Sequence, residues 1–261
     1  MYLKILSAAL TFVLCLEVQA QATTPSTPPS RTPSYSVGPI TPYSEATNPP
    51  TDVLRFRRGE RYNSPNSPLP ELGEESDPTL VTGQVGDYYR DPMPFGNSDA
   101  VFVGTIKNGQ AYLSNDKRDI YTEFNVALQE VVKTPSTPYL SSGDTIAIER
   151  NGGAVRLPSG KVLIRATNDY SMPLVGKRYL LFLKYNGAST EDYHLLTAYQ
   201  LEGDHVYRLD DLEYAYSARH HGDLAHPLRE HTSNEAQLLE QARNHEHQKG
   251  GPWATAATTQ T

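Results

Sequence analysis

Four histidines near the end of the chain are the residues best suited to binding a metal ion. His220, His221, His226 and His231 supply imidazole nitrogens, which are common ligands of zinc and copper. They lie beyond the last apolar, periodic segment, and no ordered two-by-two spacing accompanies them. The sequence leaves a metal-binding tail and a solvated tail as alternatives, and the composition favours the solvated tail.

A second set of candidates lies on the longest predicted strand, at residues 120–132. Tyr121, Glu123 and Asn125 alternate with apolar side chains, so we expect them to point away from the core. Tyrosine is frequent in this chain, with 17 residues against 6 phenylalanines, and its ring suits a recognition surface as well as the edge of a core. We predict this row as the first part of a binding surface, with packing at the core edge as the alternative.

Two basic residues, Arg156 and Lys161, form the second part of this predicted binding surface. They flank the Pro158-Ser159-Gly160 turn of a predicted hairpin. Ser159 lies in that turn and not in the Gly-x-Ser-x-Gly sequence of a hydrolase. The sequence presents no catalytic constellation, so we expect a protein without enzymatic activity and without a cofactor.

Seven or eight short strands must position these residues. Apolar or alternating segments, separated by turn signals, predict each of them. The predicted strands cover residues 100–106, 120–132, 145–150, 155–157, 161–164, 178–185, 193–201 and 205–209. This spacing is typical of an all-β sandwich or barrel.

Local signals add detail to these strands. Gly104 predicts a bulge or a close approach of backbones, and Val131-Val132 predicts a bulge near the end of its strand. Asn108-Gly109 predicts a turn. The unbroken apolar centre of residues 178–185 predicts a strand that is covered on both faces.

The first twenty residues have the features of a secretory signal peptide. Lys4 precedes an apolar run from Ile5 to Leu16, which is shorter than a membrane-spanning helix. Small residues follow in Val18-Gln19-Ala20, where a signal peptidase would cleave. The single cysteine, Cys15, lies inside this run, so we expect a secreted or periplasmic protein without disulfides.

The remaining segments are predicted to contain little regular structure. Residues 21–97 are rich in Pro, Ser and Thr, which indicates a disordered spacer and loops. Within them, residues 52–62 form a short basic patch and residues 80–82 a short strand. Residues 212–261 are predicted to be a histidine-rich tail, with a short helix near 234–244 after a capping-box spacing.

The net charge of the chain limits its partners. The formal charge is −7 at neutral pH, whereas a nucleic-acid-binding protein usually has a basic face. No apolar run after the signal segment is long enough to span a membrane. We therefore expect neither a nucleic-acid partner nor a transmembrane segment in the mature chain.

The order of features between Asp99 and Leu209 resembles the netrin-like domain, the OB-fold barrel of the tissue inhibitors of metalloproteinases and of bacterial secreted relatives. The segments that carry the resemblance are "SDAVFVGTI", "YTEFNVALQEVVK", "GDTIAI", "VGKRYLLFLKY" and "YHLLTAYQL". The resemblance implies a small closed or partly open OB-like β-barrel over residues 98–211, used for binding. The N-terminal cysteine with which the animal inhibitors chelate zinc has no counterpart here, so their mechanism is not implied.

These observations predict an exported, non-enzymatic interaction protein that presents one OB-like barrel to an unknown protein or glycan partner. Two alternatives remain open. One is a secreted protease inhibitor that acts through a loop at the barrel edge. The other is a metal-binding envelope protein that uses the late histidines.

Overall fold

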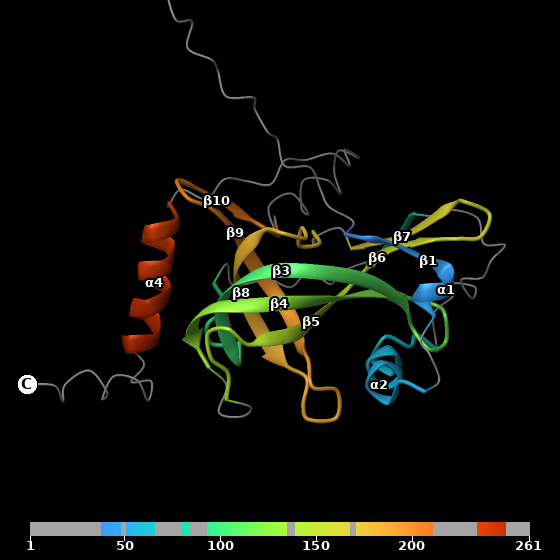
Figure 1. Ribbon diagram of the computed structural model, residues 1–261, viewed down its shortest axis with the longest axis horizontal. Coiled ribbons are helices and arrows are strands. Elements are labelled where there is room, and N and C mark those ends of the chain that lie inside the picture. Colours follow the sequence, from blue (N-terminus) through green and yellow to red (C-terminus); the bar gives the residue numbers. More distant parts are fainter. Residues whose placement is uncertain are drawn as a thin grey trace, which may run out of the picture. The chain divides into compact units, whose positions relative to one another are not determined.

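The computed structural model describes residues 38–47, 51–65, 80–83, 93–134, 139–167, 171–210 and 234–248. These residues are mostly β-structure, with one six-stranded and one four-stranded sheet (Figure 1). No helix in this part of the chain is long and apolar enough to cross a membrane. The prediction of a predominantly β chain with a short C-terminal helix is confirmed, because α4 covers Glu235–Gln248.

The six-stranded sheet contains most of the strands that alternation predicted. Its members are β3 (Ala100–Leu113), β4 (Ile120–Lys133), β5 (Thr145–Asn151), β8 (Arg178–Tyr185), β9 (Tyr193–Glu202) and β10 (His205–Arg208). The hydrogen-bonded order is β10-β9-β5-β4-β3-β8, and β9 also pairs with β8. As a result, β3, β4, β5, β8 and β9 each pair with a strand on both sides. The β5–β9 pair is parallel, and the other pairs in this sheet are antiparallel.

Strands β3 and β4 form a long pair that bends through three register shifts. One shift lies at Gly104, where a Cβ would meet Val126 Cγ1 at 2.6 Å, so the predicted close approach is confirmed. Another leaves Val132 without a partner in the register, because Phe102 pairs with Val131 and Val101 with Lys133. This confirms the bulge that the sequence predicted near the end of β4.

The turn predicted at Asn108-Gly109 is wrong, because β3 continues through both residues. A Cβ at Gly109 would lie 2.6 Å from Cδ1 of Phe124. Glycine therefore serves here to let a neighbouring aromatic ring approach the strand, which is its usual role in a strand interior.

The four-stranded sheet has the order β1-β6-β7-β2. Its strands are β1 (Ile40–Pro42), β6 (Gly153–Arg156), β7 (Val162–Thr167) and β2 (Leu80–Gly83). The antiparallel β6–β7 pair is the predicted hairpin. Strand β2 confirms the short strand predicted at residues 80–82. Strand β1 and helices α1 (Tyr43–Ala46) and α2 (Val53–Arg61) also lie in the range predicted as spacer and loops, so this range contains more regular structure than the sequence indicated.

Strand β8 is buried on both faces, as its unbroken apolar centre predicted. Leu181 and Leu183 belong to one apolar cluster, which includes Phe102 and Phe124. Leu180 and Phe182 belong to a second cluster with Leu238, Leu239 and Ala242 of α4. One face of β8 therefore packs on the strands around it, and the other packs with residues of the C-terminal helix.

Candidate functional site

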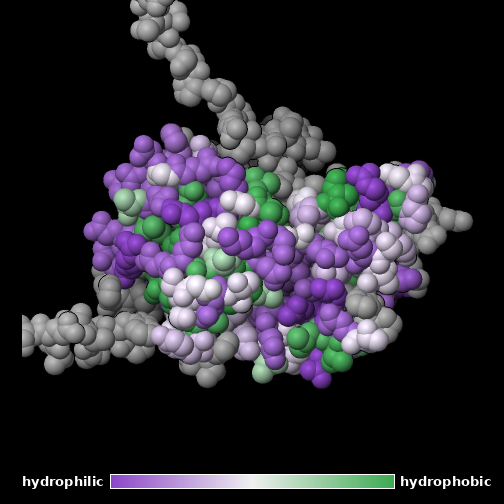
Figure 2. Space-filling view, viewed as in Figure 1, coloured by the Kyte–Doolittle hydropathy of each residue, from purple (hydrophilic) through white to green (hydrophobic). Residues whose placement is uncertain are grey.

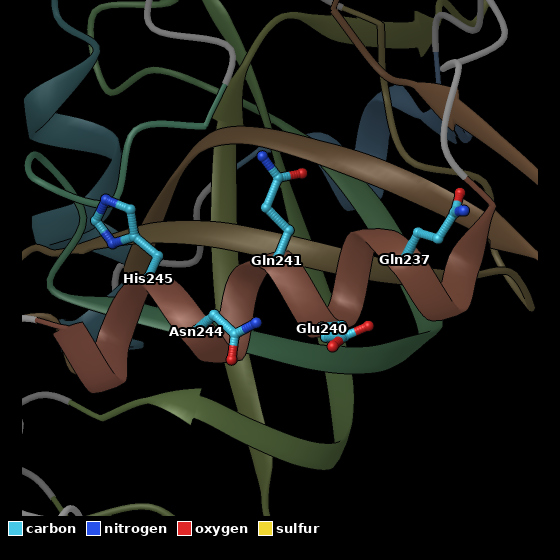
Figure 3. Close-up of a pocket in the computed structure, with 5 residues that line it drawn as sticks. All are labelled: Gln237, Glu240, Gln241, Asn244 and His245. Atoms are coloured by element: carbon cyan, nitrogen blue, oxygen red, sulfur yellow. The ribbon is translucent and has the colours of Figure 1, made fainter.

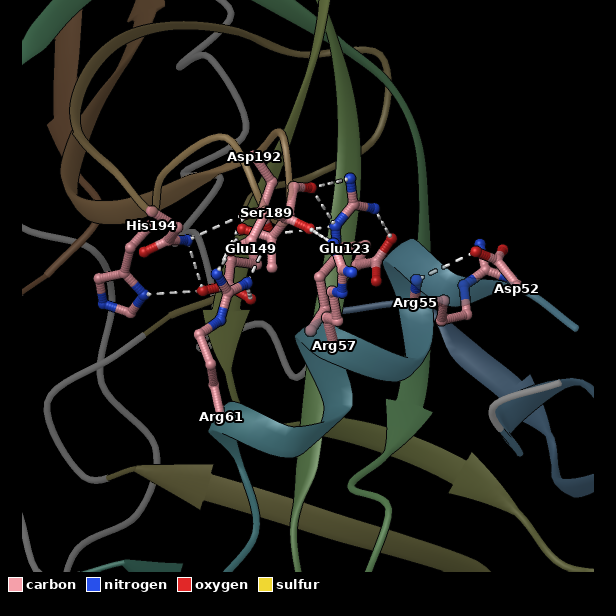
Figure 4. Close-up of polar contacts among 12 residues, drawn as sticks. Asp52, Arg55, Arg57, Arg61, Glu123, Glu149, Ser189, Asp192 and His194 are labelled. Atoms are coloured by element: carbon pink, nitrogen blue, oxygen red, sulfur yellow. Dashed lines mark hydrogen bonds and ion pairs between the residues drawn. The ribbon is translucent and has the colours of Figure 1, made fainter. Parts of the chain in front are cut away.

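Helix α2 carries arginines along one side (Figure 4). Asp52 caps its N-terminus, because the carboxylate accepts a hydrogen bond from the Arg55 amide at 3.0 Å. Arg55, Arg58 and Arg61 are spaced by three residues, which places them along one side of a helix. Arg58 is buried, whereas Val53 and Phe56 are 57% and 44% exposed. The helix therefore docks through its charged side, which reverses the usual amphipathic arrangement.

Three carboxylates from elsewhere in the chain face this side of α2. Glu123 of β4 and Glu149 of β5 are direct cross-strand partners, and Asp192 precedes β9. Glu149 and Asp192 are 2% and 1% exposed. Like charges at opposite positions of a sheet repel, and burial adds a cost to each charge. This part of the sheet therefore requires cationic partners.

Arg58 joins two of these acids to the loop between β8 and β9. Its Nη1 lies 2.9 Å from Oε2 of Glu123, and its Nε lies 3.2 Å from Oδ2 of Asp192. Its Nε and Nη2 also donate to the backbone carbonyl of Thr190, at 3.0 and 2.7 Å. All three guanidinium nitrogens of Arg58 therefore make polar contacts, and a lysine ammonium cannot reproduce this geometry.

Arg61 bridges the other pair of acids. Its Nη2 lies 2.7 Å from Oε2 of Glu149 and 2.6 Å from Oδ2 of Asp192. Its Nη1 donates to Oδ1 of Asp192 at 3.2 Å, which completes a two-point contact with one carboxylate. Burial alone would lower the pKa of Arg61, but the Asp192 hydrogen bond and the charges of Glu149 and Asp192 outweigh it and raise the pKa.

Polar groups complete the rim of this site. Asn186 Nδ2 donates to Oε1 of Glu149 at 2.8 Å, and His194 Nδ1 lies 3.7 Å from the same oxygen. Arg57 Nη1 donates to the carbonyl of Ser189 at 3.2 Å. The Arg57 contact holds the β8–β9 connection against α2, whereas the Asn186 and His194 contacts orient Glu149.

Aromatic rings contribute the apolar part of the contact. Tyr62, directly after α2, stacks on Tyr121 of β4, and the Arg55 guanidinium lies 4.0 Å from the ring centroid of Tyr112. Burial raises the pKa of the Tyr62 hydroxyl well above its usual value, and the negative charge of Glu149 and a hydrogen bond to it raise the pKa further. Tyr62 is therefore a neutral donor to Glu149. We call this surface, made of Tyr112, Tyr121, Glu123, Glu149, Thr190 and Asp192, the arginine-binding face.

Glu123 binds α2 through only one of its two carboxylate oxygens. Burial raises the pKa of Glu123, and the charges of Arg58 and Arg55 offset only part of that effect. Its Oε1 is buried and has no hydrogen-bond partner among the described residues. This oxygen is therefore an unused acceptor of the face.

This arrangement has the chemistry of a guanidinium receptor. Its carboxylates and the Thr190 carbonyl accept hydrogen bonds from two guanidinium groups, and aromatic rings lie beside them. In the part of the chain that the structure describes, no group of three His, Cys, Asp or Glu residues is placed to hold a metal ion.

The structure brings some of the predicted binding residues together and separates others. Tyr121 is fully buried under Tyr62, and Glu123 is paired with Arg58, so these two do not form the exposed row that alternation predicted. Asn125 is exposed and donates to Asn108 at 2.9 Å. Arg156 and Lys161 are exposed but belong to the β6–β7 hairpin of the other sheet.

Other predicted site residues lie outside the described part of the chain. His220, His221, His226 and His231 all fall in the segment between residues 210 and 234, so the metal-binding alternative stays a prediction. The signal segment, residues 1–20, lies outside the described residues as well.

Sequence reasoning missed the residues that make the arginine-binding face a site. Arg58, Arg61 and Tyr62 fell in a segment that was predicted only as a basic patch. Their spacing of three was the available signal, because it places basic side chains on one side of a helix. Nothing local in the sequence indicated Glu149 and Asp192 as partners, since Arg61 lies 88 and 131 residues from them in the chain.

A second polar surface lies on α4 (Figure 3). Gln237, Glu240, Gln241, Asn244 and His245 line a pocket along this helix. The opposite side of α4 carries Leu238, Leu239 and Ala242, which are buried. His245 also stacks on Phe95 with ring centroids 4.2 Å apart, so its ring contributes to holding the helix in place.

Comparison with known proteins does not assign a family. The chain matches no protein-family model and no curated protein. The resemblance to the netrin-like domain therefore remains a prediction that depends on the sequence pattern.

Proposed function

We propose that this protein is an exported, non-enzymatic interaction module that presents one OB-like β-barrel to a protein partner in the cell envelope or outside the cell. A glycan partner is the alternative that the sequence left open. The proposal joins three observations: the strand pairing, the N-terminal segment and the arginine-binding face.

The strand pairing supports the barrel. Five strands each have a paired neighbour on both sides, in the circular order β3-β4-β5-β9-β8. An OB-fold is a five-stranded Greek-key barrel that may be partly open, and such a barrel requires this kind of circular pairing. The parallel β5–β9 pair means that the order is not a simple up-and-down meander.

The N-terminal segment supports export. Lys4, the apolar run that follows it and the small residues at 18–20 have the pattern that signal peptidase recognises. A cysteine-free mature chain fits an exported protein that depends on its apolar core for stability.

The arginine-binding face is the observation that carries the interaction function. It recognises a helix from a distant part of the sequence through two guanidinium groups, a stacked tyrosine and backbone acceptors. Arginine and aromatic residues are enriched at protein interfaces, where complementary charges give specificity and fix the orientation of the partners.

Site-specific photocrosslinking in the producing cells tests this function. A photoreactive residue replaces Asn125, which is exposed beside the arginine-binding face, and in separate chains Arg156 or Lys161. Asp204, exposed in the β9–β10 turn, is the matched control. We expect a discrete adduct with one macromolecule at Asn125 and none at Asp204. Absence of an adduct at all three positions, or turnover of an envelope substrate that Glu149→Gln abolishes, would overturn the proposal.

A further inference from the structure

We infer that the arginine-binding face is a docking site for a basic helical segment of a partner protein, and that α2 is a built-in occupant that such a segment replaces. This inference depends on the proposed interaction function and names the class of partner: an α-helix with two arginines three residues apart. The arginines must neutralise the three carboxylates of the face.

The face recognises the shape of guanidinium as well as its charge. Arg61 makes a two-point contact with the carboxylate of Asp192, and Arg58 makes a two-point contact with the Thr190 carbonyl. The two arginines are three residues apart, so both reach the face only from a helix. Gly59, which follows Arg58 in the helix, is buried as well.

The contacts that hold α2 are mainly polar. Val53 and Phe56 of α2 are exposed to solvent, and the face drawn in Figure 2 is mostly hydrophilic with scattered hydrophobic areas. After the helix, the Ser64 amide donates to Asp116 Oδ2 at 2.7 Å and the Asp116 amide donates to Asn63 Oδ1 at 3.0 Å. Release of residues 51–65 therefore breaks mainly polar contacts and one tyrosine stack, and segments with few buried apolar contacts are the ones that open locally.

The face favours a cation when α2 leaves it. With α2 in place, Glu149 and Asp192 are almost fully buried, and Glu123 is the cross-strand neighbour of Glu149. Three acids this close repel one another strongly without a basic partner. Replacement of α2 by another arginine-bearing helix relieves the repulsion among the three acids. Release of α2 without a replacement does not relieve it. The buried Oε1 of Glu123, which α2 leaves without a hydrogen bond, gives a competing helix one further acceptor to use.

Binding of a labelled peptide to the full-length protein tests the inference. The probe is a fluorescent peptide with the sequence of residues 51–65, and its charge-matched control carries Lys at positions 58 and 61. Fluorescence anisotropy compares the wild-type chain with the R58A/R61A variant, whose own α2 no longer fills the face. Occupation in cis reduces the apparent affinity of a competitor, so we expect the variant to bind the probe at least about tenfold more tightly than the wild type does.

Two further binding measurements test the inference. The lysine peptide should bind at least about tenfold more weakly than the probe, and Asp192→Asn in the R58A/R61A chain should weaken the probe to the same extent. Equal binding of both peptides would mean that charge alone attracts them, and this would overturn the inference. So would failure of the variant to bind the probe while its circular dichroism and unfolding midpoint show a folded β domain.

Arg61→Ala alone serves if the double variant does not fold, since Arg61 is the more exposed of the two arginines. This single variant should bind the probe more tightly than the wild type, and unchanged binding would contradict the inference. If the peptide binds but crosslinking in cells finds no partner, only the proposed function is refuted. An adduct at Asn125 without peptide binding would refute this inference only.

Discussion

The ring of Tyr62 lies flat on the ring of Tyr121, with centroids 4.5 Å apart and planes 4° from parallel. Tyr62 directly follows α2, and Tyr121 lies near the beginning of β4. The stack therefore covers the part of β4 that would otherwise face solvent. It also places the Tyr62 hydroxyl beside Glu149, next to the two arginines that neutralise the buried acids.

Removal of the Tyr62 ring should loosen α2 without unfolding the sheet. Tyr62→Ala loses the stacking and part of the buried area, for which we expect a loss of about 2 kcal/mol in the free energy of unfolding. Tyr62→Phe keeps the ring and removes only the hydroxyl, and it should cost about 1 kcal/mol. Urea unfolding of the two variants measures both values. Equal costs for the two would show that stacking contributes nothing.

Asp192 should be the most sensitive acid of the face, because it contacts both Arg58 and Arg61. Asp192→Asn leaves two guanidinium groups without their shared charge, and breaking a buried pair costs about 3 kcal/mol or more. Glu130→Gln breaks the exposed pair with Arg243 and should change stability by less than about 0.5 kcal/mol. Similar unfolding midpoints for both variants would contradict the structure of this cluster.

Gly153 should not tolerate a side chain. Its φ is +144°, and a Cβ would lie 2.4 Å from Oγ1 of Thr122, whose hydroxyl donates to the Gly152 carbonyl. Backbone strain and the clash together predict a loss of about 3 kcal/mol for Gly153→Ala. Gly160 also has a positive φ but has open space around it, so Gly160→Ala should cost about 1 kcal/mol. Thermal unfolding of the two variants separates the clash from the strain.

Stability should fall in acid partly through Asp99. Burial alone would raise its pKa, but the hydrogen bonds from Lys184 Nζ and the Tyr185 amide outweigh burial and lower the pKa below the usual 3.8. The pKa of Asp99 in the folded protein then lies below its pKa in the unfolded chain. The ionised carboxylate therefore stabilises the fold fully at pH values above the unfolded pKa. This contribution disappears as the pH falls through the folded pKa.

Asp99→Asn should therefore lose less stability than the wild type between about pH 5 and pH 2. Lys184→Gln removes one of the two hydrogen bonds and should show the same change to a smaller extent. Urea midpoints measured across this pH range test both variants. An unchanged acid dependence in Asp99→Asn would show that another group carries it.

Export should remove the first twenty residues. Mass spectrometry of the protein recovered from the cell envelope or the culture fluid should give an N-terminus at Gln21, because Val18 and Ala20 are the small residues before the cleavage point. Ala20→Arg should leave the segment attached. A mature protein that begins at Met1 would contradict the proposed export.

The strands were predictable from the sequence because alternation of apolar and polar residues is a local property. The packing of α2 and Tyr62 on the other side of β4 was not predictable. The period-two pattern shows which side of a strand faces the core but not what lies on the opposite side. Tyr121 was misassigned for this reason. The turn signal at Asn108-Gly109 failed because close packing of Phe124 explains the glycine.

The candidate site was predictable only in part. Glu123 and Asn125 were identified from their row on β4, while the arginines were identified only as a basic patch. Their role depends on pairing Arg58 with Glu123, 65 residues away, and Arg61 with Asp192, 131 residues away. Such pairs are set by the strand order, and no local pattern in a single sequence contains that information.

Hydrogen–deuterium exchange of the unaltered protein tests most directly whether α2 is an exchangeable occupant. We expect amides of residues 56–61 to exchange through local opening at least about tenfold faster than those of residues 122–126 in β4. Exchange of both segments at one rate would show that α2 opens only when the whole domain unfolds and would contradict this account.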